Sequence, residues 1–94
     1  MDNPVTDNPR TGRYEMQVAG RTAFITYHRE AQVVTLLHAE VPQELSGQGI
    51  GSALARGTLK LARAQGYKVV ARCSFVASYI NAHAEFHDLL VAAH

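Results

Sequence analysis

A glycine-rich turn before a long amphipathic helix pattern constrains this chain more than any other feature of its sequence. The turn contains Gly47, Gly49 and Gly51, and it follows an apolar stretch with strand character. The first backbone N–H groups of the predicted helix have no acceptor within the helix. Such groups, together with the helix dipole, bind phosphate without a basic side chain. The turn therefore predicts an anion site, and a tight connection without a ligand is the alternative that spacing alone leaves open.

Two common phosphate-binding motifs do not describe this turn. The dinucleotide fingerprint GxGxxG requires a third glycine where this chain has Ser52. The P-loop requires a Gly-Lys-Ser/Thr sequence, which does not follow the turn. The turn is thus a glycine cradle of another kind.

The hydrophobic pattern around the turn predicts an α/β domain. Residues 32–41 and 68–73 read as strands on either side of the helix 49–65, so this β-α-β unit makes the two strands parallel. Residues 1–12, rich in Pro, Asn and Asp, are expected to be a flexible lead-in to a domain at 13–94. The remaining elements are predicted as strands at 14–19 and 21–29 and helices at 75–83 and 85–92.

Composition excludes several classes of protein. The chain has 94 residues and 47% hydrophobic residues, which fits one globular domain. Its net charge of +1 argues against nucleic-acid and membrane-surface binding. Cys73 is the single cysteine, so an internal disulfide is excluded and a reducing compartment is favoured. We expect a cytoplasmic protein that is a monomer or a weak dimer.

The glycine turn resembles the acetyl-CoA-binding motif of the Gcn5-related N-acetyltransferases, Arg/Gln-x-x-Gly-x-Gly/Ala. Gly49 and Gly51 occupy its two small positions, and Ser46 stands where Arg or Gln is usual. A second stretch, which begins Cys73-x-Phe75, resembles a subgroup of small single-domain members. The resemblance covers residues 13–90.

This resemblance implies a minimal acetyltransferase fold and a cofactor site. Strands one to three would be antiparallel, the fourth parallel, with the long helix 49–65 on one face and further helices at the C-terminus. The function implied is acetyl transfer from acetyl-CoA to an amine. The residues implied in acetyl-CoA binding are Ser46, Gly47, Gln48, Gly49, Ile50 and Gly51 for the pyrophosphate, Ala39 and Val41 for the pantetheine arm, and Arg56 for the 3′-phosphate.

Three residues are candidates for the chemistry. Cys73 ends a predicted parallel strand before a helix and is either a nucleophile that carries the acetyl group or a small buried residue. His38 and Glu40 are placed on one face of strand 32–41, together with Val34 and Leu36. Either His38 or Glu40 would serve as the base that takes a proton from the amine, unless the two form an ordinary surface pair.

The acceptor side is expected to be open. The first two predicted strands are separated only by a turn, whereas the wider family has a helical segment there. An open side suits an exposed amine on a protein or a small polyamine-like molecule. The alternative is a domain that binds CoA, for example as a sensor, without efficient transfer. A plain interaction domain is a third class. The stretch from His83 to His87 lacks the spacing of a zinc motif, so no metal site is predicted. Tyr79 is assigned to packing.

Overall fold

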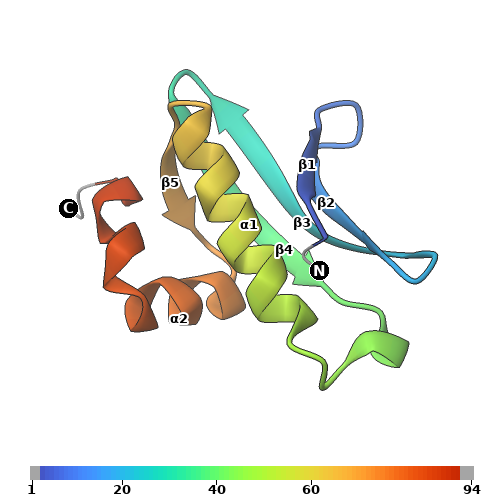
Figure 1. The fold of residues 1–94 in the computed structure, drawn as a ribbon. Coiled ribbons are helices and arrows are strands. Elements are labelled where there is room, and N and C mark those ends of the chain that lie inside the picture. The colour runs from blue at the N-terminus through green and yellow to red at the C-terminus, as the bar shows by residue number, and fades with distance from the viewer. Residues whose placement is uncertain (1–2, 92–94) are drawn as a thin grey trace.

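The computed structural model describes residues 3–91 and contains one five-stranded sheet with helices on one face. The strands lie in chain order, antiparallel from β1 to β4, and β5 is parallel to β4 (Figure 1). This arrangement confirms the predicted fold class. No helix of the described residues is long and apolar enough to cross a membrane. The elements are β1 (Val5–Asn8), β2 (Arg13–Val18), β3 (Arg21–Glu30), β4 (Val33–Glu40), the 3₁₀ helix η1 (Gln43–Leu45), α1 (Ile50–Ala64), β5 (Lys68–Ala71), α2 (Ser74–Ala82) and the 3₁₀ helix η2 (Ala84–Leu89).

Helix α1 packs across the sheet and supplies the centre of the core. It crosses the strands diagonally, and α2 lies on the same side, beside the N-terminal half of α1 (Figure 1). The helix buries the apolar arc that the sequence predicts, including Leu54 and Leu59. The opposing sheet residues are also fully buried, among them Ile25, Val34 and Leu36. Burial on this scale holds α1 in a fixed position relative to the end of β4, which matters for the glycine turn between them.

The C-terminal helix differs from the prediction. Residues 85–92 were expected to form a helix, but the structure has a 3₁₀ helix that ends at Leu89. Leu90 then forms a parallel bridge with Val69, and the Val91 N–H donates to the Val69 carbonyl. Pairing with the free edge of β5 replaces the helical hydrogen bonds there. Residues 92–94 lie outside the described part of the chain.

Strand β1 was not predicted, because its residues fall within the expected lead-in 1–12. Val5–Asn8 pairs antiparallel with residues 13–16. Its four residues, flanked by Pro4 and Pro9, carry too little alternation to be recognised from sequence, and an edge position tolerates such prolines. Gly57 allows the strand to approach α1, since a Cβ atom at Gly57 would lie 2.4 Å from Val5 Cγ2.

A partly buried carboxylate attaches β1 to the rest of the domain. Asp7 accepts hydrogen bonds from the Tyr27 hydroxyl at 2.6 Å and from Arg29 Nη1 at 2.6 Å. Gln65, at the end of α1, donates to Asp7 at 2.8 Å and accepts from the Tyr14 hydroxyl at 2.9 Å. Burial raises the pKa of Asp7, but these hydrogen bonds outweigh it and hold the pKa below its ordinary value of 3.8. Burial and the Asp7 charge raise the pKa of Tyr14 to about 12.

We expect Asp7→Asn to lower the free energy of unfolding by about 2 kcal/mol at neutral pH, because charged hydrogen bonds are lost. A carboxylate whose pKa is depressed by folding stabilises the fold above its unfolded pKa and loses that contribution as the pH falls. The difference between wild type and variant, measured by urea unfolding, should therefore shrink towards about pH 2. Asp88→Asn, which removes an exposed carboxylate paired with Arg63, should change stability by less than about 1 kcal/mol. A pH-independent difference for Asp7→Asn would contradict this account.

A β-bulge in β4 corrects the predicted orientation of two candidate residues. Tyr27 pairs with Leu36, but Thr26 pairs with His38, so Leu37 is an extra residue in β4. The sequence prediction assumed strict alternation and placed His38 and Glu40 on the face of Leu36. The bulge reverses the alternation, because Ala39, which pairs with buried Ile25, and Val41 now pack against the core.

Candidate functional site

The ends of β4 and β5 separate and leave an opening in the sheet. The last parallel pair is Leu36 with Ala71. Beyond it, the N–H groups of Arg72 and Cys73 both donate to the Leu36 carbonyl, at 2.9 and 3.1 Å. Residues 37–40 of β4 therefore have a partner strand only on the β3 side. We call this space the β4–β5 opening, and its closed end is the Leu36 carbonyl.

Ala39 presents unpaired backbone groups to the β4–β5 opening. The Tyr27 N–H donates to the Gly12 carbonyl, on the side of β3 that faces β2. Backbone groups of every second residue point to the same side of a strand, so the N–H and C=O of Ile25 also point towards β2. Ala39 pairs with Ile25 in a position without ladder hydrogen bonds, and its own N–H and C=O point away from β3. An extended ligand in the opening would find donors and acceptors there.

The glycine turn lies at the mouth of this opening and has free N–H groups. Gly47 and Gly49 have φ angles of 81° and 75°, a region that favours glycine. Gly49 is the N-cap of α1 and no side chain caps the helix. Among residues 3–91, the N–H groups of Gly49, Ile50 and Gly51 donate no hydrogen bond. These are the groups that the sequence predicted to bind an anion, and no atom of the described part of the chain accepts a hydrogen bond from them.

Two side chains of the turn are engaged elsewhere. The Ser46 hydroxyl donates to the Gln43 carbonyl at 2.8 Å and closes η1. The Gln48 amide lies 3.5 Å from the Glu44 carbonyl, at the limit for a hydrogen bond, and the side chain is exposed. The Ser46 N–H also donates to the Gln43 carbonyl, at 3.1 Å, so neither the side chain nor the N–H of Ser46 is free to bind an anion.

A groove of about 560 Å³ continues from the turn along α1, and we call it the α1 groove. Gln48 and Gly49 form one end of it, and Arg56 and Lys60 lie farther along the helix. Neither Arg56 nor Lys60 forms an ion pair within residues 3–91, whereas Arg63 pairs with Asp88. The opposite wall comes from Asn3, Pro4, Val5 and Met16, so the unpredicted β1 region helps to shape the groove.

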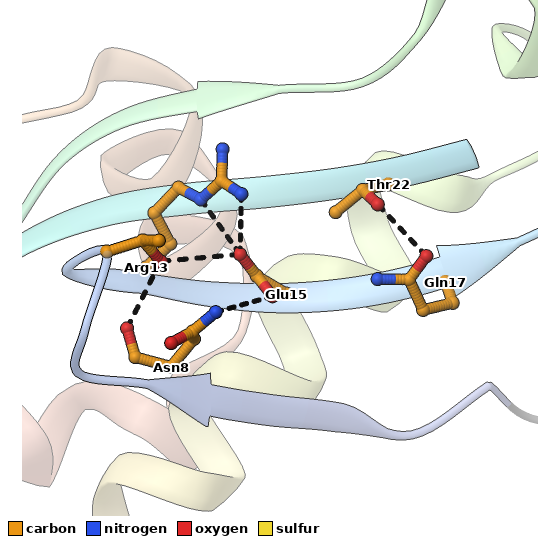
Figure 2. Close-up of polar contacts among 6 residues, drawn as sticks. Asn8, Arg13, Glu15, Gln17 and Thr22 are labelled. Atoms are coloured by element: carbon orange, nitrogen blue, oxygen red, sulfur yellow. Dashed lines mark hydrogen bonds and ion pairs between the residues drawn. The ribbon is translucent and has the colours of Figure 1, made fainter.

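His38 and Glu40 lie together on the sheet face without helices. His38 Nε2 is 3.2 Å from Glu40 Oε1, and both side chains are well exposed. Glu40 pairs across β3 with Phe24. The nearby Glu15 carboxylate is less available to take a proton, because Arg13 Nη2 lies 2.6 Å from it and the Asn8 amide donates to it (Figure 2). The His38–Glu40 pair is therefore the more accessible base on this face.

Cys73 lies at the closed end of the β4–β5 opening. It is the N-cap residue of α2, and its side chain belongs to the hydrophobic core with 9% exposure. The structure brings Cys73 within one hydrogen bond of β4 but keeps the residue largely buried. Tyr79 is also buried and stacks on the His83 ring, with centroids 3.9 Å apart. Within residues 3–91, no three His, Cys, Asp or Glu side chains are grouped as metal ligands would be.

The sequence analysis missed three parts of this site. Leu37 is 43% exposed and Phe75 is 42% exposed, and both lie within two residues of the hydrogen bond that closes the opening. Lys60 was not singled out, because only Arg56, which is nearer the glycine turn, was assigned to the 3′-phosphate. The short segment 3–5 gave no signal, since its place in the α1 groove depends on the pairing of β1.

The fold and the site define a class of protein before any comparison is made. A parallel strand pair that separates at a helix N-terminus with free N–H groups is typical of an α/β domain that binds an anionic ligand. The family model of the GCN5-related N-acetyltransferases matches residues 13–89. The chain belongs to that family and is an acetyltransferase by this membership.

A solved structure supports the same fold. The NMR structure of a GCN5-like protein from Staphylococcus aureus superposes with a TM-score of 0.70, at 23% sequence identity. The alignment covers 100% of this chain and 94% of that chain. No curated protein is a significant sequence match.

Proposed function

We propose that this protein transfers the acetyl group of acetyl-CoA to an amine. The observation that carries the proposal is the combination of free N–H groups at Gly49–Gly51 with the unpaired edge of β4. A diphosphate fits the first feature, because the helix N-terminus is positive and bears donors. An extended arm with amide groups fits the second, because it can pair with Ala39 as a strand would.

Each part of acetyl-CoA has a proposed binding region. Backbone N–H groups of residues 47–51 hold the pyrophosphate, and the backbone of residues 39–41 pairs with the pantetheine arm. Ser46, which the sequence analysis also included, is left out because its N–H already donates to the Gln43 carbonyl. The α1 groove takes the adenosine 3′-phosphate beside Arg56 and Lys60, neither of which forms an ion pair within residues 3–91. Along this path, the thioester would lie towards the closed end of the β4–β5 opening, near Leu36 and Cys73.

The proposed chemistry is direct transfer assisted by a base on the open sheet face. The amine attacks the thioester carbonyl only when its nitrogen is unprotonated. Glu40, alone or through His38, accepts the amine proton. The C–S bond breaks, the acetyl group forms an amide, and the CoA sulfur leaves as a thiolate that takes up a proton. Holding the two reactants in this geometry supplies much of the rate enhancement.

The open acceptor side supports two further proposals. The exposed His38–Glu40 pair is suited to an amine on a protein surface or to a small polyamine-like molecule. The same exposure favours, as the alternative function, a module that binds CoA without efficient transfer. Cys73 stays a candidate acetyl carrier, and its low exposure favours the packing role. The single free cysteine suits a reducing, cytoplasmic setting.

One experiment separates these functions. Acetyl-CoA is titrated into the full chain while backbone amide shifts are recorded, and acetylation of a panel of amines, peptides and proteins is followed by mass spectrometry. Transfer requires shifts at Gly49–Gly51 and acetylated product. Shifts without product indicate the binding module, and no shifts at all contradict both proposals. An acetyl adduct on Cys73 before acceptor is added would indicate a covalent route.

We expect Arg56→Gln combined with Lys60→Gln to weaken CoA binding about tenfold, because the 3′-phosphate loses two cations. Dephospho-CoA lacks that phosphate, so its affinity should be nearly the same for wild type and variant. Arg10→Gln removes an exposed cation outside the groove and serves as the control. Calorimetric titration measures all six combinations. Equal weakening for CoA and dephospho-CoA would show that the groove does not hold the 3′-phosphate.

A further inference from the structure

Gly51 and Phe75 form a matched pair that the glycine motif does not explain. Gly47 and Gly49 have positive φ angles, and an added Cβ atom would meet nothing within 4 Å at either position. Gly51 has no positive φ angle, so backbone conformation does not require glycine there. Instead, a Cβ atom at Gly51 would lie 2.9 Å from Phe75 Cζ. Glycine at position 51 therefore leaves room for the end of the Phe75 ring, and a side chain there would require the ring to move.

Phe75 lies between the starts of the two helices. It is the second residue of α2, two positions after Cys73, whose N–H closes the β4–β5 opening. Its ring reaches the first turn of α1 at Gly51, and Figure 1 shows the start of α2 beside α1. Despite this contact, 42% of the residue is exposed. A large apolar ring is thus held against the helix end and still offers surface to a ligand.

Packing in the protein core does not account for the position of the Phe75 ring. Val76, Tyr79 and Ile80 are the buried residues of α2, and Phe75 is not among them. Leu37, the extra residue of the β4 bulge, is 43% exposed and adjoins the Leu36 carbonyl. Exposed apolar residues therefore occur in the chain next to both partners of the hydrogen bond that ends the opening, with Leu37 directly after the acceptor Leu36 and Phe75 two positions after the donor Cys73.

We propose that Phe75 is the apolar wall against which the pantetheine arm packs, and that the absence of a side chain at Gly51 leaves room for the ring in that position. This inference rests on the proposed function, since it assigns a wall to the same ligand. It makes Phe75 a binding residue for the arm and not for the phosphates. The ring then favours ligands that carry the pantetheine arm over ligands that contain only the adenosine phosphates.

The test compares CoA with adenosine 3′,5′-bisphosphate, which lacks the arm, by calorimetric titration. Phe75→Ala should weaken CoA about tenfold, because a half-exposed ring loses its contact with the arm. The same variant should bind the bisphosphate within about twofold of wild type. Equal weakening of both ligands, or no weakening of CoA, would overturn the inference. Wild type that binds neither ligand would instead remove the proposed function itself.

A second set of variants covers the case in which Phe75→Ala is poorly folded. Gly51→Ala should push the ring out of place and weaken CoA, although the N–H of residue 51 is retained. Adding Phe75→Ala to Gly51→Ala removes the clash and should restore the affinity of the Phe75→Ala single variant. Phe75→Leu, which keeps an apolar side chain, should lie between wild type and Phe75→Ala. A double variant that binds CoA more weakly than Phe75→Ala alone would contradict the matched pair, because the two effects would then be independent.

Discussion

Gly49→Glu is expected to weaken CoA binding on the order of a hundredfold, because it places a carboxylate beside the proposed pyrophosphate site. Gly49 is the N-cap of α1, and apart from its two chain neighbours no described residue has a heavy atom within 4 Å of an added Cβ. The new side chain would therefore enter the space in front of the free N–H groups without displacing the protein. Its negative charge would both repel the phosphates and compete for the same donors.

Gly66→Glu is a close control for this variant. Gly66 lies just beyond the other end of α1, has a φ of 84°, and likewise has nothing within 4 Å of an added Cβ. Both substitutions carry the same cost of a positive φ and the same change of charge. Stability should fall by a similar amount in the two variants, on the order of 1 kcal/mol, while only Gly49→Glu loses CoA. Equal CoA affinity for the two variants would remove the pyrophosphate from the start of α1.

Glu40→Gln is expected to lower kcat on the order of a hundredfold, because it removes a general base while keeping the shape of the side chain. The KM for acetyl-CoA should hardly change, since the Glu40 side chain lies on the helix-free face and the substitution leaves the backbone proposed to pair with the pantetheine arm intact. The rate is measured with the best amine from the acceptor panel. His38→Gln tests whether the imidazole carries the proton, and a loss equal to that of Glu40→Gln would indicate that the pair acts as a unit.

The chain supplies a matched control for this variant as well. His28 and Glu30 repeat the His-x-Glu spacing on β3, with His28 Nε2 3.9 Å from Glu30 Oε1, and both are exposed. This pair lies at the end of the sheet where β5 still covers the edge of β4, since Glu30 pairs with Val33 and Val33 with Lys68. Glu30→Gln should leave kcat unchanged. If Glu30→Gln and Glu40→Gln reduce the rate equally, the effect is one of surface charge and Glu40 is not the base.

Much of the fold could be predicted because its signals are local. The 3.6-residue period of α1 and its glycine ends fix the helix to within one residue of the predicted 49–65. The β-α-β order then requires β4 and β5 to be parallel. The free N–H groups at Gly49 follow from the start of a helix that has no capping side chain.

The parts that could not be predicted depend on distant pairings. The bulge at Leu37 exists only as a register shift between β3 and β4, and it alone turns His38 and Glu40 to the helix-free face. Strand β1 is stabilised by Asp7, whose partners on β3 and α1 lie 20 or more positions away. The contact of Phe75 with Gly51 likewise joins two helix ends that are separate in the chain.

The sequence by itself determined that a helix with a glycine-rich start would follow a central strand, because backbone conformation and apolar periodicity are local properties. Only the tertiary structure decided which side of the sheet carries the candidate base and which aromatic ring lies beside the proposed path of acetyl-CoA. Those outcomes depend on strand register and on packing between helix ends, and both arise from contacts that form only when the chain is folded.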